Sequence, residues 1–371
     1  QEWSGLRLRL DSDRERLMIK WQSFAALDGR PLTELPGLAV KSSLSSIIGR
    51  GDSVTVSLPV CDRWPANWRD GTQPMRAVLA AIEDNLVLWA GWVEKRSYGS
   101  DEAMELTLQP AEEWLKRNYI PELAFRDQRY TTIARGIGLD RLVAQFNGRL
   151  DEDPTLDWGD RTYRADQDMT CLAGLQNLMK TKHGAEFATS WELHANGHLG
   201  IVVHTAHRLG GVGKDTAGAA VLSQGSWQQV EDCSDGKGAT IWRAVSNRSG
   251  DERKEVVTSN GQVLQYGWLE LERRWSPDTG SVDEAVLNQY LYAARYSQQY
   301  GLTSISVETT LDHFMPGRDF VLGDYVDVDM TNLSNPELQF KGKARVIGWV
   351  CDPDPVSGEI TKIKPMLSLE D

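Results

Sequence analysis

Four of the six histidines lie close together in the sequence, and histidine is the most common metal ligand among the side chains. His194 and His198 flank Asn196-Gly197, the strongest short signal for a β-hairpin, so the two imidazoles are expected to approach one another. His204 and His207 follow. A zinc site needs a third ligand, and no Cys or Asp nearby has the spacing of a zinc motif. We therefore predict exposed hairpin histidines and no metal site.

The glycine-rich segment ending in Gly213-Lys214 resembles a phosphate-binding loop only in part. The Walker pattern requires Gly at position 208 and Ser or Thr at position 215, where this chain has Arg208 and Asp215. Residues 210–220 are mostly Gly and Ala, which predicts a linker. No nucleotide or other cofactor is expected.

Carboxylates that could bind calcium or hydrolyse a glycan are present without a recognisable pattern. After Asp151, the Gly and Glu that a calcium loop requires are replaced by Leu156 and Thr162. Glycan hydrolysis needs two carboxylates facing each other across a cleft, which a sequence cannot place. No serine-nucleophile elbow, HExxH motif or set of nucleophile, base and orienting group is recognisable. We predict no catalytic residues and keep a glycan (peptidoglycan) hydrolase as an alternative.

The composition is that of a globular chain with an acidic surface. Of 371 residues, 40% are hydrophobic and 25% are charged, which excludes a disordered chain or a coiled-coil rod. The net charge of −13 disfavours capture of nucleic acid phosphates. The 14 tryptophans keep a carbohydrate-binding adhesin as a second alternative.

Two further features of the sequence concern membrane insertion and the state of the cysteines. No apolar run reaches the roughly 20 residues that a membrane helix needs. The four cysteines form no CxxC pair, which favours reduced thiols in a protein assembled in a cytoplasm.

Alternation of apolar and polar residues predicts a first β-barrel over residues 1–110. A turn at Glu83-Asp84-Asn85 is expected to join two of its strands. The predicted strands include residues 6–10, 18–21, 54–58, 77–82, 86–96 and 104–108.

The pattern changes after Pro110, and residues 111–208 are predicted to form an α+β unit. Helices are expected over residues 111–117, over 132–146 and from Met169 onward, with Asp168 as the N-cap of the last, because apolar residues recur at spacings of three and four. The hairpin around Asn196-Gly197 packs with them.

Residues 217–258 and 303–371 predict a second β-barrel, interrupted by a connector over 259–302 with one helix at 282–300. The predicted fold class is therefore mainly β: two similar antiparallel β-barrels, a helix-and-hairpin domain and a connector. Strands are expected at 227–230, 240–245, 268–274, 304–310, 325–329, 341–350 and 360–367.

Two short words recur in the same order at the two ends of the chain. Gly51-Asp52-Ser53-Val54-Thr55-Val56 and Gly323-Asp324-Tyr325-Val326-Asp327-Val328 share the pattern GDxVxV, and Gly91-Trp92-Val93 matches Gly348-Trp349-Val350. One explanation is coincidence between hairpins rich in Gly, Asp and Val. The other, which we predict, is two related barrels in which residues 51–56 and 91–108 are equivalent to 323–328 and 348–367, with both tryptophans in cores.

The chain resembles the tail-tip hub proteins of long-tailed phages, most closely the minor tail proteins of actinobacterial siphophages. The resemblance covers most of the chain. In the C-terminal half it rests on Tyr266-Gly267, Glu270, Ala293-Ala294, Pro316-Gly317-Arg318-Asp319-Phe320 and Leu322-Gly323-Asp324-Tyr325-Val326. In the N-terminal half it rests on Gln109-Pro110, Trp114-Leu115 and Tyr119-Ile120-Pro121.

What the resemblance implies is a structural role. Such baseplate hubs are homotrimers at the tail tip, and each subunit carries two similar barrels, so that three chains present six barrels to the sixfold tail tube. The expected partners are further copies of the chain and the distal tail and tape-measure proteins of the same virion. DNA would pass through the ring without specific binding, and the protein would be assembled in the host cytoplasm.

Overall fold

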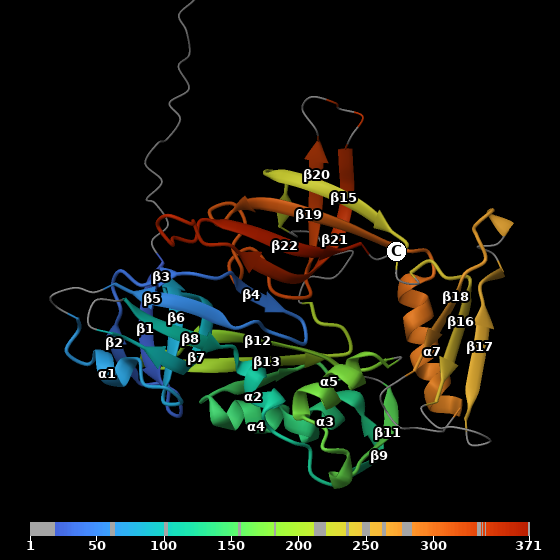
Figure 1. The fold of residues 1–371 in the computed structure, drawn as a ribbon, viewed down its shortest axis with the longest axis horizontal. Helices are drawn as coiled ribbons and strands as arrows, with labels where there is room; N and C mark the ends of the chain where they lie inside the picture. Colours follow the sequence, from blue (N-terminus) through green and yellow to red (C-terminus); the bar gives the residue numbers. More distant parts are fainter. Residues whose placement is uncertain are drawn as a thin grey trace, which may run out of the picture.

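The computed structural model has a mainly β fold with few helices, which confirms the predicted fold class (Figure 1). It describes residues 19–59, 64–99, 103–154, 157–181, 183–210, 220–234, 237–246, 253–261, 265–276, 284–331, 335, 337 and 339–369. The strand predicted at residues 6–10 and the linker core at 211–219 lie outside these ranges. Among the described helices, none combines the length and apolar character required to cross a membrane.

The first sheet is curled and has seven strands in the order β2-β1-β6-β7-β8-β5-β3. Asp84 and Asn85 adopt positive φ angles of 45° and 70°, which is the backbone of a two-residue hairpin turn between β6 and β7, as predicted. All but the last residue of β6 are buried because both faces of the strand are covered. The strands are β1 (Lys20–Ala25), β2 (Pro31–Glu34), β3 (Ala39–Val40), β5 (Val54–Leu58), β6 (Ala77–Glu83), β7 (Leu86–Ser97) and β8 (Met104–Gln109), with α1 (Trp68–Gly71) beside them.

The α+β unit covers one face of this sheet (Figure 1). Its three-stranded sheet has the order β10-β13-β12, with β10 parallel to β13, and β9 pairs with β11. Thr170, not Asp168, caps α5: Thr170 Oγ1 accepts from the Ala173 N–H at 3.2 Å. The elements are α2 (Ala111–Lys116), β9 (Leu123–Arg129), α3 (Tyr130–Ala134), the π-helix η1 (Arg135–Leu139), α4 (Asp140–Gln145), β10 (Arg149–Glu152), β11 (Trp158–Tyr163), the 3-10 helix η2 (Ala165–Gln167), α5 (Cys171–Met179), β12 (Glu186–Leu193) and β13 (Leu199–Ala206).

The second sheet lies against the first and has the order β14-β20-β21-β22-β19-β15 (Figure 1). Its pairs are antiparallel except β14 with β20. One hydrophobic core includes side chains from both sheets, so the two sheets share an interior. The strands are β14 (Val221–Leu222), β15 (Ser226–Asp232), β19 (Leu302–Thr310), β20 (Tyr325–Thr331), β21 (Gln339–Cys351) and β22 (Lys362–Ser368).

A separate unit stands at the side of the molecule (Figure 1). Helix α7 (Glu284–Gln298) packs on a sheet with the order β17-β16-β18, formed by β16 (Ile241–Val245), β17 (Glu255–Ser259) and β18 (Glu272–Trp275). The structure therefore corrects the expected boundary: strands β16 and β17 belong with the connector and not with the second sheet. The reason is the core, because Trp242 and Ala244 pack against Leu287 and Leu291 of α7.

Candidate functional site

The two sheets are joined by a strand that leaves the first and pairs with the second. Strand β4 (Leu44–Ile47) pairs antiparallel with β21, with Ser46 opposite Trp349. The Trp89 indole of β7 donates to the Ser45 carbonyl at 3.1 Å, in a buried position. Because backbone pairing and a shared core both cross this seam, the two sheets form one mechanical unit.

A buried ion pair connects the α+β unit with the second sheet. The Arg345 side chain on β21 is 2% exposed and forms a two-pronged pair with the carboxylate of Glu186 on β12. Arg345 also donates to the Leu209 carbonyl at 2.9 Å and the Gly323 carbonyl at 3.2 Å, and the Leu209 N–H donates to Glu186 at 2.9 Å. The network therefore fixes the segment in which the chain leaves β13 toward the second sheet.

A cavity of about 510 Å³ lies where the three units meet. Its walls come from β7, the start of α2, the β12–β13 hairpin and residues 316–322, with Trp349 also in the lining. Glu112 of α2 faces the cavity while being only 4% exposed overall, and Thr189 Oγ1 donates to its carboxylate at 2.7 Å. Burial raises the pKa of Glu112 above its ordinary value, because the charged form loses its hydration.

We predict that Glu112 makes the protein less stable as the pH rises. A carboxyl whose pKa is raised by folding contributes its full stability below the unfolded pKa, near 4.5, and loses that contribution as the pH passes the folded pKa. Replacing Glu112 by Gln should therefore raise the free energy of unfolding at pH 8 by on the order of 1 kcal/mol, with little effect at pH 4.5. Urea titrations at both pH values test this, with Glu105→Gln on an exposed strand position as the control. The prediction is contradicted if Glu112→Gln changes the free energy of unfolding, relative to the wild type, by the same amount at pH 8 and at pH 4.5.

Three side chains on the hairpin sheet are connected as nucleophile, base and orienting group. Asp151 on β10 is opposite His204 on β13. On the other side of β13, Ala188 of β12 is opposite His204, and Ser190 lies two residues after Ala188 on the same face of the sheet. Ser190 Oγ lies 2.8 Å from His204 Nε2, and His204 Nδ1 lies 3.1 Å from Asp151 Oδ2. The expectation that no residue set has this connectivity is wrong, because strand pairing unites residues distant in sequence.

The chemistry that this set allows is limited by its surroundings. Burial lowers the pKa of His204, so its imidazole is neutral near pH 7 and able to accept a proton. Acyl transfer also needs preorganised donors for the oxyanion. Ser190 lies within a strand and not at the sharp strand-to-helix turn of the nucleophile-elbow enzymes.

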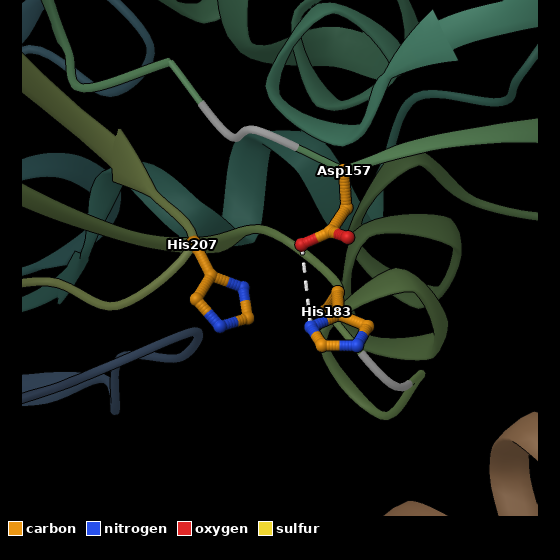
Figure 2. A group of neighbouring side chains, drawn as sticks. All are labelled: Asp157, His183 and His207. Atoms are coloured by element: carbon orange, nitrogen blue, oxygen red, sulfur yellow. Dashed lines mark ion pairs between the residues drawn. The ribbon is translucent and has the colours of Figure 1, made fainter.

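The hairpin histidines His194 and His198 do not belong to the group of possible metal ligands that the structure brings together. His194 is half-buried near Glu192, and the His198 ring lies 2.9 Å from the Asp28 carbonyl. Instead, His207 lies with His183 and Asp157, and the ligand atoms of the three are within 4.8 Å of one another (Figure 2). His183 and Asp157 were not predicted as ligands, because no motif or ligand spacing connects them with the histidines at positions 194–207.

The two GWV words occupy corresponding strands but face different cores. Strands β5 to β8 and β19 to β22 have the same pairing plan, in which the first strand pairs with the fourth, the second with the third and the third with the fourth. GWV lies on the third strand in both cases, β7 and β21. Trp92 is buried against the α+β unit, whereas Trp349 is buried in the core shared by the two sheets.

The two GDxVxV words do not occupy corresponding strands, which corrects part of the predicted repeat. Val54 and Val56 lie on β5, the first strand of its set, whereas Val326 and Val328 lie on β20, the second of its set. The four valines share the common core because the alternation places them on inward faces. A GDxVxV motif indicates the start of a half-buried strand, but it does not determine the position of that strand in the sheet.

The remaining residues of the words have local roles. Gly91, Gly348 and Gly51 leave no room for a Cβ, which would lie 2.4 Å from Trp89, 2.9 Å from Ile47 and 2.7 Å from Pro110 respectively. Val93 is in the shared core and Val350 is half-buried.

The acidic residues of the GDxVxV words differ in exposure, although both accept hydrogen bonds. Asp52 is exposed and accepts from Ser45 Oγ at 2.9 Å, whereas Asp324 is buried and accepts from the Val321 N–H at 3.0 Å. Gly323 has a φ of +99°, which favours glycine, and an added Cβ would lie 2.1 Å from the Leu209 carbonyl oxygen.

Comparison of the fold with solved structures finds phage tail proteins. A tail protein from Neisseria meningitidis matches with a TM-score of 0.58 and 11% identity over 95% of this chain and 96% of that one. A 43 kDa prophage tail protein from Shewanella oneidensis matches with a TM-score of 0.54 and 10% identity over 94% and 98%. A prophage tail protein from Listeria monocytogenes matches with a TM-score of 0.51 and 9% identity over 95% and 94%.

At these identities the likeness is one of fold. No family model matches the sequence. No curated protein shows significant sequence similarity to it.

Proposed function

We propose that this protein is a structural subunit of a phage tail, placed at the hub of the tail tip. The observation that carries the proposal is the plan of two curled sheets with corresponding strands, joined by β4 across a shared core. The tail proteins from Neisseria, Shewanella and Listeria have a similar fold along nearly the whole chain. A rigid two-sheet body suits a mechanical part that transmits load between neighbours.

The hub assembles as a homotrimer in this proposal, because two related sheets in each of three chains supply six units to a sixfold tube. Strand β15 ends the second sheet and leaves an edge that pairing with a neighbour would cover. Val230 on β15 is 40% exposed. On α7, Tyr292 and Tyr296 stack on each other and are 51% and 67% exposed, which favours a second contact surface there.

The acidic charge suits a ring that DNA crosses. Three chains carry three times −13, or −39, and a wall of that sign does not bind phosphates electrostatically. The partners of the ring would be the distal tail and tape-measure proteins. The finer assignment to minor tail proteins of actinobacterial siphophages rests on the sequence words at residues 316–320 and 322–326.

Reconstruction of tail tips that carry this chain tests the proposal by electron cryomicroscopy. We expect three copies around the axis, a lumen with more Asp and Glu than Lys and Arg, and β15 covered by a neighbouring subunit. A single copy on the axis, or a lumen dominated by Lys and Arg, contradicts the hub assignment.

The second candidate, a hydrolase, is favoured by the Ser190–His204–Asp151 connectivity beside a cavity. We expect the purified chain to release no soluble fragments from peptidoglycan above a buffer control, since Ser190 lies within strand β12 and not at a nucleophile elbow. The Ser190→Ala variant is the matched control. Release that the wild type produces and Ser190→Ala abolishes would replace the hub proposal by the hydrolase.

The adhesin alternative requires several exposed tryptophans on one face. Among the tryptophans whose burial the structure describes, Trp158 and Trp268 are exposed, at 52% and 37%, and they belong to different units. Trp21, Trp89, Trp92, Trp242 and Trp349 are buried. This distribution favours a role of the tryptophans in packing.

A further inference from the structure

We propose that Asp157, His183 and His207 form a binding site for a divalent transition-metal ion of the zinc type. Asp157 directly precedes β11, His183 lies in the turn between α5 and β12, and His207 directly follows β13. Figure 2 shows the carboxylate of Asp157 and the rings of His183 and His207 turned toward a common space. The proposal is independent of the tail function.

The spacing of the ligand atoms fits a tetrahedral ion. His183 Nδ1 lies 3.3 Å from Asp157 Oδ2. An ion bound tetrahedrally at about 2.0–2.1 Å from each ligand places ligand atoms about 3.3–3.4 Å apart. The third ligand atom, on His207, is within 4.8 Å of the other two, and the exposed ring closes the remaining distance by rotation of its side chain. The two imidazole rings already lie 5.5 Å apart between centroids, at an angle of 33°.

The described residues on either side of His183 are held by hydrogen bonds. Thr181 Oγ1 donates to the Leu178 carbonyl at 2.7 Å, and the Gly184 N–H donates to the Thr181 carbonyl at 3.0 Å. A Cβ at Gly184 would lie 1.9 Å from the Leu178 carbonyl oxygen, so the turn packs closely on the end of α5. His183 itself has a φ of +62°, a conformation in which His is enriched over most residues. The ligand is thus positioned by the fold before any ion binds.

The donor set selects the class of ion. Two imidazole nitrogens and one carboxylate oxygen suit zinc and its transition-metal neighbours, whereas magnesium prefers six oxygen ligands. Three protein ligands leave a fourth position for water. The side chains of His183 and Asp157 are 40% and 46% exposed, which gives the ion access from solvent.

An ion at this site would connect three segments that the backbone leaves separate. One of them is the exit from β13, two residues before Leu209, whose carbonyl accepts from Arg345 of the second sheet. Metal binding would therefore stabilise the region in which the chain passes from the α+β unit to the second sheet, and only the folded chain presents all three ligands together.

Calorimetric titration of the metal-free, full-length protein with ZnCl2 tests the site. We expect one saturable site per chain, no comparable binding of MgCl2, and a melting temperature raised by roughly 5 °C when zinc is a hundredfold above its Kd. Asp157→Asn, His183→Asn and His207→Ala should each weaken binding by at least about tenfold. Asn is chosen at position 183 because it tolerates a positive φ.

His194→Ala is the matched control. His194 also lies near a carboxylate, with its Nδ1 atom 3.8 Å from Glu192, but it is outside the proposed site. The variant should leave zinc affinity unchanged. Melting without metal checks that each variant is folded, and the variants at the half-buried Asp157 and the exposed His207 keep the test valid if His183→Asn lowers stability. Two results would overturn the proposal and indicate adventitious zinc binding only. One is that Asp157→Asn and His207→Ala both bind zinc as tightly as the wild type. The other is that His194→Ala loses as much zinc affinity as they do.

Discussion

Replacing Arg345 by Met should lower the free energy of unfolding by about 3 kcal/mol, because the Glu186 carboxylate, which is 13% exposed, loses its two-pronged partner and keeps only the more distant Arg208 at 3.5 Å as a cation. It also removes the donors to the carbonyls of Leu209 and Gly323, two further groups in the interior. Chemical unfolding followed by circular dichroism measures the change.

The matched control for this pair is Lys362→Met. Lys362 is 62% exposed and contacts Glu308 at 2.9 Å, so its loss should cost less than about 1 kcal/mol. The double variant Arg345→Met with Glu186→Met should recover part of the loss, because neither charge of the Arg345–Glu186 pair then remains in the interior. If Arg345→Met costs no more than Lys362→Met, the buried pair does not hold the second sheet to the α+β unit.

Replacing Trp349 by Ala should also cost about 3–5 kcal/mol. The side chain is 3% exposed in the core shared by both sheets, and its strand pairs with β4 at this position. Trp349 also lines the cavity of about 510 Å³, so truncation would enlarge an existing space that the surroundings have not filled. Urea unfolding measures the loss.

Trp158→Ala is the control for the size of the side chain, because Trp158 is 52% exposed and its ring contacts Arg129. It should cost about 1 kcal/mol or less. Equal losses at positions 349 and 158 would show that burial in the shared core contributes nothing particular to Trp349.

These two variants act on the two connections that the hub proposal needs. Trp349 lies at the seam between the sheets, and Arg345 lies between the second sheet and the α+β unit. A tail component must keep its units in fixed relation while neighbours pull on them. If the protein is a hub, Arg345→Met and Trp349→Ala should both make the assembled tail less stable, and neither should act through a loss of catalysis.

Short-range patterns along the chain were sufficient to predict much of the local structure. The strands predicted at residues 54–58, 77–82, 86–96 and 104–108 correspond to β5, β6, β7 and β8, and apolar spacing indicated α2, α5 and α7. The hairpin around Asn196-Gly197 and the turn at Asp84-Asn85 were also predictable, because backbone conformation there depends on a few adjacent residues. The mainly β fold class follows from these local preferences.

Which of these strands are neighbours, and which distant side chains meet, depends on long-range packing and could not be predicted from local patterns. The GDxVxV words have the same alternation but start different strands of their sets, because alternation fixes the buried face and not the pairing partner. Arg345 and Glu186 are 159 residues apart, and Ser190, His204 and Asp151 meet only through strand register. Asp157, His183 and His207 likewise come from three loops that no spacing rule connects, since their proximity depends on how the hairpin, α5 and β11 pack.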